Sequence, residues 1–248
     1  MDKSIPAPFS RVGGKTRLKT RILPLFPKEF KTYVEPFVGG GAIVMGHKFT
    51  EGQKIVLNDK DSKLMAAWRA LKAAHNPQAY AKYNTTSLPT LQRLADSGPP
   101  LVKAIVVSKN TFMSMGDAGG AKPKLYSNIN PWNVLRRVDE YSAKLRGATL
   151  SSGDYGAVLA RHNNPNTFVY LDPPYEKSDD QGVYKHGDFD YGRLAARLRA
   201  FKGKWLLSIN DSANIRRLFK GYKARRFTVS SNSPAFTSSR HELLISNY

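Results

Sequence analysis

The chain has 248 residues, enough for one sizeable hydrophobic core with room for a smaller inserted domain. Its formal charge of +20 favours a polyanionic partner such as nucleic acid, because each neutralised phosphate releases condensed counterions. The absence of cysteine excludes disulfides and thiolate zinc sites, and the five scattered histidines show no metal-ligand spacing. With no signal-peptide pattern and no membrane-spanning run, we expect a cytoplasmic protein.

The first predicted strand covers residues 32–34 and leads into a glycine-rich turn. The turn reads Glu35-Pro36-Phe37-Val38-Gly39-Gly40-Gly41-Ala42, and the apolar residues after it can begin a helix. Glycines at such a turn let the backbone adopt positive φ and approach a ligand closely. Many strand-to-helix turns contain glycines for packing alone, so this segment by itself fits a nucleotide-like ligand and a packing turn equally well.

The second predicted strand, residues 54–57, is followed by Asn58 and Asp59. Dinucleotide-binding folds hold ribose hydroxyls with an acid at this point, about 20 residues after the glycines. The alternative is that Asp59 caps the helix predicted over residues 62–74. The spacing from the glycine-rich turn favours the ligand role.

Residues 76–144 break the alternation of strands and helices. The segment is rich in Pro, Gly, Ser and Asn, notably at residues 97–100 and 116–120. This composition predicts an insertion with short helices and loops, a common place for recognition elements. We therefore expect a catalytic domain made of residues 1–75 and 145–248 and an inserted region over residues 76–144.

The third predicted strand, residues 167–171, is followed directly by Asp172-Pro173-Pro174-Tyr175. Two consecutive prolines cannot continue a sheet ladder, so the chain leaves the sheet there on a stiff turn. The Asp172 carboxylate and the Pro173 carbonyl then offer two acceptors, and Tyr175 offers a flat stacking surface. This set suits an amino group on a planar base, whereas the alternative is a plain strand-ending turn.

Two more strands are predicted over residues 205–209 and 242–245, and a helix over residues 191–202. In that helix Leu194, Leu198 and Phe201 share one face. Strands that alternate with helices in this way predict an α/β protein with a mostly parallel sheet.

An ordered set of segments resembles the Dam-like family of DNA adenine methyltransferases (D12 class, alpha group), in which cofactor segments precede the catalytic motif. The matching segments are residues 9–15 (the glycine-glycine-lysine motif), 35–41 (the cofactor loop), Asp59 (the ribose-binding acid), 152–155 (the acid and aromatic residue beside the cofactor's adenine) and 172–175 (the catalytic motif, unchanged). Residues 189–194 and 242–248 resemble later family segments. The ordered set covers nearly the whole chain.

The resemblance implies a Rossmann-like methyltransferase sheet with an inserted, mainly helical target-recognition domain. It also implies methyl transfer from S-adenosylmethionine to the exocyclic N6 amino group of adenine in double-stranded DNA, with base flipping and without a metal. The implied catalytic residues are Asp172, Pro173, Pro174 and Tyr175. The implied cofactor-binding residues are Phe9, Gly13, Gly14, Lys15, Glu35, Pro36, Phe37, Gly39, Gly40, Gly41, Asp59, Asp154, Tyr155 and Asp172.

The inserted region departs from the family pattern. Over residues 108–116 only Asn110, Phe112 and Gly116 match the family's asparagine-arginine and phenylalanine motif, so we assign no target sequence. We expect a monomer or weak dimer, with restriction-modification among the possible roles. The candidate DNA-binding residues are Lys109, Asn110, Lys122, Lys124, Tyr184, Arg216 and Arg217.

Three other functions stay open at this point. The chain could methylate RNA, or the amino group of cytosine, although aspartate in the first position of the motif favours adenine. Methylation at carbon 5 of cytosine is excluded, because it needs a cysteine nucleophile. A catalytically silent nucleic-acid-binding relative would need neither Asp59 nor Asp172.

Overall fold

We describe a computed structural model of the chain over residues 4–11, 13–111, 123–175, 189–229 and 240–248. The chain divides into two compact units, each of which we describe by itself. Unit 1 comprises residues 1–25 and 38–153, and unit 2 comprises residues 26–37 and 154–248. Among the described helices, none is long and apolar enough to cross a membrane.

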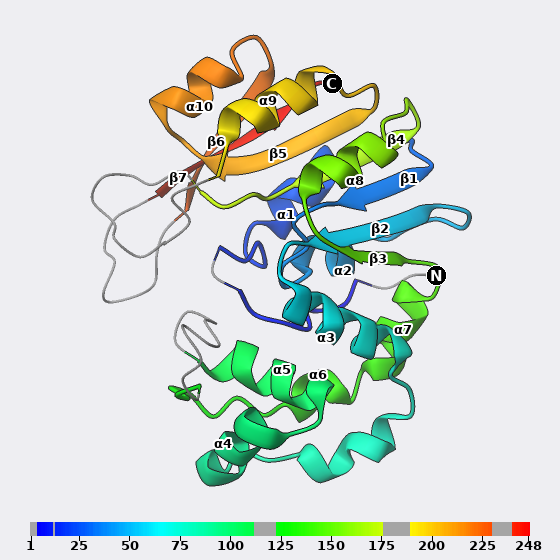
Figure 1. The fold of residues 1–248 in the computed structure, drawn as a ribbon, viewed down its shortest axis with the longest axis vertical. Coiled ribbons are helices and arrows are strands. Elements are labelled where there is room, and N and C mark those ends of the chain that lie inside the picture. The colour runs from blue at the N-terminus through cyan, green and yellow to red at the C-terminus, as the bar shows by residue number, and fades with distance from the viewer. Residues whose placement is uncertain (1–3, 12, 112–122, 176–188, 230–239) are drawn as a thin grey trace. The chain divides into compact units, whose positions relative to one another are not determined.

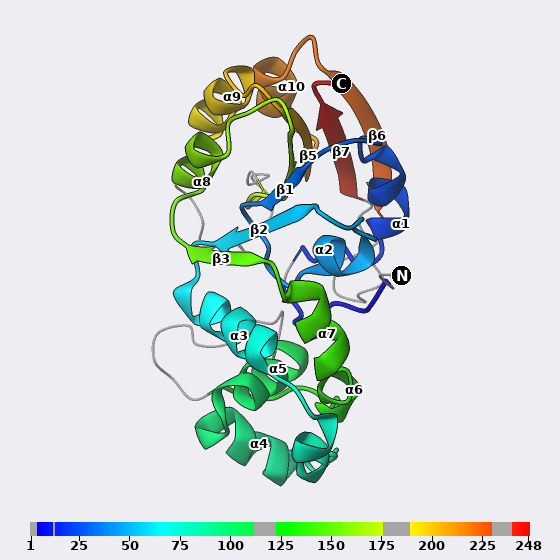
Figure 2. The ribbon, with the colours of Figure 1, turned by 90° about the vertical axis from the view of Figure 1, so that its right-hand side faces the viewer.

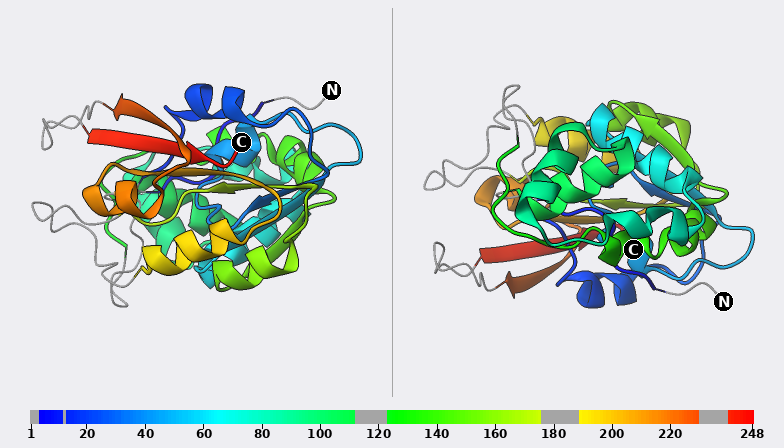
Figure 3. Two further views of the ribbon diagram at one scale, coloured as in Figure 1. Left: turned by 90° about the horizontal axis from the view of Figure 1, so that it is seen from above. Right: turned by 90° about the horizontal axis from the view of Figure 1, so that it is seen from below.

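The described residues of unit 2 form five strands in the order β1-β4-β5-β7-β6 (Figure 1). The strands are β1 (Thr32–Glu35), β4 (Thr167–Leu171), β5 (Lys204–Asn210), β6 (Lys223–Val229) and β7 (Arg240–Ser246). The pairings β1–β4 and β4–β5 are parallel, whereas β7 runs antiparallel to both β5 and β6 (Figure 3). All five residues of β4 are buried, as expected for a central parallel strand that is covered on both faces.

The described residues of unit 2 also form three helices: α8 (Tyr155–Arg161), α9 (Tyr191–Arg199) and α10 (Ala213–Leu218). Helix α9 contacts both α8 and α10. Each helix begins after a side chain that accepts a backbone N–H of its first turn; these caps are Asp154, Asp190 and Ser212. Leu194 and Leu198 are buried on one face of α9, as predicted. The helix ends at Arg199 and not at residue 202, so the buried Phe201 lies just after it.

Unit 1 contains the parallel pair β2 (Lys54–Asp59) and β3 (Thr149–Ser152), together with most of the helices (Figure 2). The helices are α1 (Lys19–Ile22), α2 (Ala42–Gly46), α3 (Ser62–Ala73), α4 (Leu88–Ser97), α5 (Pro100–Asn110), α6 (Trp132–Leu135) and α7 (Val138–Leu145), with 3-10 turns η1 (Leu23–Leu25) and η2 (Pro77–Tyr83). Helix α3 packs against α5, α7 and β3, and its Met65, Trp68 and Leu71 are fully buried.

The N-terminal segment packs onto the helices of unit 1. The Tyr141 hydroxyl of α7 donates to the carbonyl of Pro6 at 3.0 Å, and the Ile5 N–H donates to the carbonyl of Met45. The side chains of Ile5 and Phe9 are almost completely buried. This packing fixes the backbone that leads into the motif over residues 9–15.

The predicted α/β class is confirmed, and all five predicted strands are present. The sheet is mixed, because β7 runs antiparallel to both of its neighbours, β5 and β6. Strands β3 and β6 were not predicted. The described part of residues 76–144 holds η2 and the helices α4 to α7, but their role as a separate recognition domain stays a prediction.

Candidate functional site

The glycine-rich turn of unit 1 has a backbone that other residues could not adopt. Gly39 and Gly41 have positive φ angles of 47° and 79°. A Cβ at Gly40 would lie 2.5 Å from the carbonyl oxygen of Phe9, and one at Gly41 would lie 2.3 Å from the Trp68 ring. The turn is therefore specified both by conformation and by close packing. At Gly39 nothing lies within 4 Å of an added Cβ, so the backbone there is open to a ligand.

Trp68 of α3 packs against this turn and forms a hydrogen bond with it. Its indole N–H donates to the carbonyl of Gly39 at 3.0 Å, and its ring meets Phe9 edge-on with ring centroids 5.4 Å apart. Through these two contacts a single buried side chain connects α3, the glycine turn and the N-terminal segment. Sequence reasoning missed Trp68, because its distance along the chain from the turn hides the contact.

Asp59 closes β2 beside the same turn. One carboxylate oxygen accepts the Gly39 N–H and the other accepts the Asp61 N–H, each at 3.0 Å. Burial raises the pKa of Asp59, although these two N–H donors and the positive charge of Arg11 lower it in part. Each oxygen retains a second lone pair that could accept a ligand hydroxyl.

The helix-cap alternative for Asp59 is wrong. The residue that precedes α3 is Asp61, whose carboxylate accepts the Leu64 N–H at 3.0 Å and pairs with the Arg11 guanidinium. Asp61 thus satisfies one of the free N–H groups of the first turn of α3. Asp59 is left to hold the glycine turn.

The glycine-glycine-lysine segment also lies in unit 1. Gly13 has a φ of 77°, the Gly14 N–H donates to the Arg11 carbonyl, and the Lys15 ammonium donates to the Gly13 carbonyl at 2.8 Å. Lys15 is only 3% exposed. The segment is therefore a compact turn with a buried lysine, and its predicted role in cofactor binding stays a prediction.

The second group of predicted cofactor residues lies in unit 2, around Tyr155 at the start of α8. The rings of Tyr155, Phe37 and Phe189 form a cluster, in which each pair of ring centroids is 5.2 to 5.8 Å apart. The Arg193 guanidinium lies 5.1 Å over the Tyr155 ring. These contacts gather one predicted pair, Phe37 and Tyr155, with two residues that were not predicted.

Asp154, the cap of α8, is strongly engaged by Arg193. The guanidinium forms a two-pronged ion pair with the carboxylate at 2.6 and 2.9 Å, and this pairing holds the pKa of Asp154 below its usual value. A carboxylate held in this way is fixed in position beside the aromatic cluster. Arg193 lies within the family-like segment 189–194, but sequence reasoning gave it no role, because it is 39 positions from Asp154.

Glu35 ends β1 and is 2% exposed. Its carboxylate accepts the Tyr33 hydroxyl at 2.7 Å. Pro36 follows and leads the chain to Phe37. The contacts of Glu35 and Pro36 with the cofactor stay a prediction.

The predicted catalytic motif leaves the sheet at the end of β4. Leu171 is buried, Asp172 is half-buried, and Pro173 is buried. The Tyr191 hydroxyl of α9 donates to the carbonyl of Pro174 at 2.9 Å, which ties α9 to the motif. The stiff turn expected from the two prolines is thus held from a second side, by a residue that was not predicted.

Tyr175 lies close enough to two carboxylates, those of Asp172 and Glu242, for their charges to act on it. Burial, followed by the charges of Asp172 and Glu242, raises the pKa of Tyr175 well above its usual value, so the ring stays a neutral phenol. Glu242 of β7 is 8% exposed and accepts the Ser208 hydroxyl of β5 at 3.4 Å. Strands β5 and β7 therefore supply the polar surroundings of the motif.

Two of the candidate DNA-binding residues lie at the end of α5. The half-buried Lys109 ammonium donates to the Ala7 carbonyl. The buried Asn110 amide donates to the carbonyls of Val106 and Ile129, and its oxygen accepts the Ile129 N–H and the Ser127 hydroxyl. These four bonds leave no donor or acceptor of Asn110 for DNA, so this side chain instead holds residues 127–129 against α5.

Other candidates are exposed. Lys124 lies over the ring of Tyr126, which is 62% exposed and was not predicted. Arg216 forms a two-pronged ion pair with Asp211. Because Asp211 also pairs with Arg226, it compensates the charge of Arg216 only in part. Arg217 donates to the Asn214 side chain. Lys122 and Tyr184 lie outside the described residues.

Comparisons with known proteins agree with the motif. Residues 12–97 and 121–231 match the family described as D12 class N6 adenine-specific DNA methyltransferase. The chain is 26% identical to the type II methyltransferase M.CviBI of Paramecium bursaria Chlorella virus NC1A, over 95% of this chain and 97% of that protein. It is 25% identical to the DNA adenine methylase of Vibrio cholerae serotype O1 (strain El Tor Inaba N16961), over 89% and 88%.

Solved structures are much less similar. One is the precorrin-6y C5,15-methyltransferase of Geobacter metallireducens GS-15, with 9% identity, a TM-score of 0.41, and coverage of 100% of this chain and 98% of that one. A similarity at this level carries no functional information.

Proposed function

The chain belongs to the D12 class N6 adenine-specific DNA methyltransferases, and we propose that Asp172, Pro173 and Tyr175 direct its methyl transfer to adenine. The family implies S-adenosylmethionine as cofactor and DNA as substrate. The observation that supports the proposal best is the unchanged Asp172-Pro173-Pro174-Tyr175 motif at the end of the buried strand β4, tied to α9 through Tyr191.

The glycine turn and Asp59 fit a cofactor that carries a ribose. The turn is open at Gly39, and the Asp59 carboxylate has lone pairs left after it accepts its two backbone N–H groups. We assign the ribose hydroxyls to Asp59, because a half-buried carboxylate with free lone pairs is a strong acceptor for such donors. We assign the flanking of the adenine ring to Asp154 and Tyr155, where aromatic side chains gather.

The attacking nitrogen of adenine has to be activated for the methyl transfer. S-adenosylmethionine supplies an electrophilic methyl group on a sulfonium sulfur. The amino nitrogen of the target adenine is a poor nucleophile, because its lone pair is conjugated into the ring. In our proposal the Asp172 carboxylate and the Pro173 carbonyl accept hydrogen bonds from its two N–H groups, which favours a tetrahedral nitrogen and stabilises the positive charge that develops on it. The new N–C bond would form as the bond between the methyl group and sulfur breaks, and the methylated nitrogen would then lose one proton to become a neutral amine. Tyr175 stacks on the base, which is flipped out of the duplex.

A direct assay tests the function. The protein is incubated with methyl-labelled S-adenosylmethionine and duplex DNA, single-stranded DNA or RNA, and the products are digested to nucleosides. We expect label in N6-methyladenine from duplex DNA. Label in cytosine, or in RNA alone, would contradict the proposal. Absence of label despite cofactor binding would identify a silent relative.

We also propose that residues 76–144 form the target-recognition region, and that residues 1–75 and 145–248 carry the chemistry. The exposed Tyr126 and Ile129, with Lys124 over the Tyr126 ring, support this assignment, because exposed aromatic and apolar side chains in a basic setting are suited to contacts with bases. We further propose double-stranded DNA in the cytoplasm as the partner and a monomer or weak dimer as the acting species. We expect no metal requirement.

Exchanging residues 76–144 for the matching segment of a relative with a different target should transfer the sequence preference. Sequencing of methylated genomic DNA from cells that express each chimera measures this preference. The segment contacts the N-terminal residues through Tyr141 and Pro6, so cofactor titration serves as the folding control. A folded chimera that keeps the original preference would show that recognition lies in the flanking parts.

A further inference from the structure

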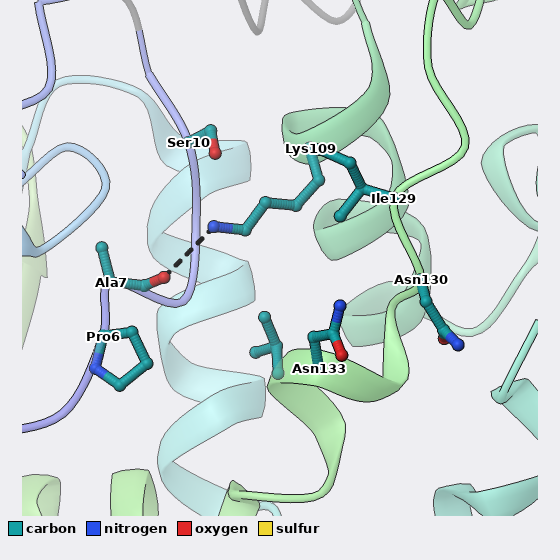
Figure 4. Close-up of a pocket in the computed structure, with 8 residues that line it drawn as sticks. Pro6, Ala7, Ser10, Lys109, Ile129, Asn130 and Asn133 are labelled. Carbon is teal, nitrogen blue, oxygen red and sulfur yellow. Dashed lines mark hydrogen bonds between the residues drawn. The ribbon is translucent and has the colours of Figure 1, made fainter. Parts of the chain in front are cut away.

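A pocket in unit 1 lies where the N-terminal segment, the end of α5 and residues 129–134 meet. It has a volume of about 300 Å³. Its lining residues are Pro6, Ala7, Ser10, Lys109, Ile129, Asn130, Asn133 and Val134. Figure 4 shows the Lys109 side chain reaching from α5 to the N-terminal segment, with Ser10 on one side and Asn133 on the other. Lys109 is the one charged residue among those that line the pocket.

The Lys109 ammonium has few hydrogen-bond partners for a half-buried positive charge. It donates to the Ala7 carbonyl at 3.2 Å, which is the one acceptor that the described residues provide for it. An ammonium has three N–H donors, so two remain without a protein partner there. Burial lowers the pKa of Lys109, which means that the protein environment disfavours its charge. A bound anion would offset this effect, because its negative charge would stabilise the charged form of the ammonium.

Two uncharged donors accompany this ammonium. The Ser10 hydroxyl and the Asn133 amide line the same pocket, and neither forms a side-chain hydrogen bond within the described part of the chain. Asn130 differs, because its amide already bonds to the Trp132 N–H and the Asn84 side chain. The pocket therefore offers one positive charge and two free polar side chains.

The wall of the pocket is fixed before any ligand binds. The four hydrogen bonds of Asn110 hold residues 127–129 against α5, directly beside Lys109. The Tyr141–Pro6 bond holds the opposite wall. A preorganised site of this kind loses little conformational entropy on binding.

We propose that this pocket is a phosphate site, in which Lys109, Ser10 and Asn133 hold one backbone phosphate of the DNA substrate. The proposal rests on the proposed function, because that function supplies the polyanion. A single ammonium with hydroxyl and amide donors matches a phosphate oxygen set better than it matches a base edge. The site positions DNA next to Lys124 and Tyr126 without reading its sequence.

The test compares Lys109→Gln with wild type. Affinity for two duplexes, one with and one without the methylation target, is measured by fluorescence anisotropy over a series of salt concentrations. We expect Lys109→Gln to weaken both duplexes by the same factor, about tenfold or more. We also expect the slope of log affinity against log salt to fall by about one, as the loss of one phosphate contact requires.

Lys103→Gln is the matched control. Lys103 lies on the same helix, is also half-buried, and donates to the Asp96 carbonyl, but it does not line the pocket. We expect it to keep the wild-type slope. Asn133→Ala removes an exposed, uncharged donor, so it should weaken both duplexes and leave the slope unchanged. Lys109→Arg should keep the slope, and melting curves with cofactor titrations show whether each variant is folded.

Several outcomes would overturn the assignment. A folded Lys109→Gln with the wild-type slope, or one that loses affinity for only the target duplex, would exclude a phosphate contact. Titration of wild type with inorganic phosphate separates a second source: if phosphate binds and Lys109→Gln abolishes this binding yet binds DNA normally, the pocket serves a free anion. Methylation by wild type is assayed in parallel, so failure of the phosphate site is distinguishable from failure of the proposed function.

Discussion

Asp172→Ala is expected to reduce single-turnover methylation by about a hundredfold or more, because loss of one preorganised acceptor at a reacting centre typically has this effect. The carboxylate is proposed to accept a hydrogen bond from the adenine amino group as the nitrogen becomes tetrahedral. Cofactor affinity should change little, since the ribose and adenine contacts are assigned to Asp59, Asp154 and Tyr155. Asp172→Asn keeps one acceptor oxygen and should lose less activity.

A structural role for Asp172 would give a different pattern. Asp172 follows the fully buried strand β4, so a mere strand-ending role predicts a lower melting temperature and a parallel loss of cofactor binding and methylation. A melting curve, a cofactor titration and single-turnover methylation on the same variant separate the two roles. A folded variant that binds cofactor and methylates adenine at nearly the wild-type rate would contradict the proposed mechanism.

Asp59→Ala is expected to weaken cofactor binding by about a hundredfold. Two hydrogen bonds to a charged acceptor, at about 1.5 kcal/mol each, correspond to about 3 kcal/mol and hence to this factor. The variant also frees the Gly39 N–H, which loosens the turn. Calorimetry measures the affinity, and equal affinity in wild type and variant would contradict the assignment.

Asp61→Ala provides the matched control, because Asp61 lies two residues away, caps α3 and pairs with Arg11. We expect it to lower the melting temperature by removing a helix cap worth about 1 kcal/mol, while cofactor affinity changes only a few-fold. A loss of affinity as large as that of Asp59→Ala would mean that general loosening of this region, and not the Asp59 carboxylate, explains both variants.

The same carboxylate sets a pH dependence. Binding to ribose hydroxyls as a charged acceptor requires the ionised form of Asp59, and burial raises its pKa above the usual value. As pH falls, Asp59 therefore takes up its proton at a higher pH than an ordinary aspartate. Cofactor affinity should weaken over that window, and the Asp59→Asn variant should lack this pH-dependent component.

The sequence predicted the strands that carry continuous apolar runs and missed the two that do not. Strand β3 (Thr149–Ser152) contains mainly Thr and Ser, and β6 (Lys223–Val229) begins Lys-Ala-Arg-Arg. β6 is an edge strand, where basic side chains are common because they discourage pairing with other chains. A run of basic residues does not show the apolar alternation by which a strand is recognised in a sequence, so β6 was not predicted.

The candidate site was predictable where its residues lie within one motif. Asp59 and the 172–175 motif were identified from strand ends and spacing. Trp68, Arg193 and Tyr191 were not, since each acts on a motif through a contact that only the folded chain creates. The assignment of helix capping to Asp61 instead of Asp59 likewise required the hydrogen bonds of each carboxylate.

The position of Trp68 makes it an intrinsic fluorescent probe of the glycine turn. The chain has three tryptophans, and the indole of Trp68 touches both the Gly39 carbonyl and Phe9, whereas Trp205 donates to the Leu198 carbonyl in a fully buried setting of unit 2. Indole fluorescence responds to the polarity and hydrogen bonding of its surroundings. With Trp132 and Trp205 replaced by phenylalanine, emission from Trp68 would report displacement of the glycine turn in real time, without any attached dye.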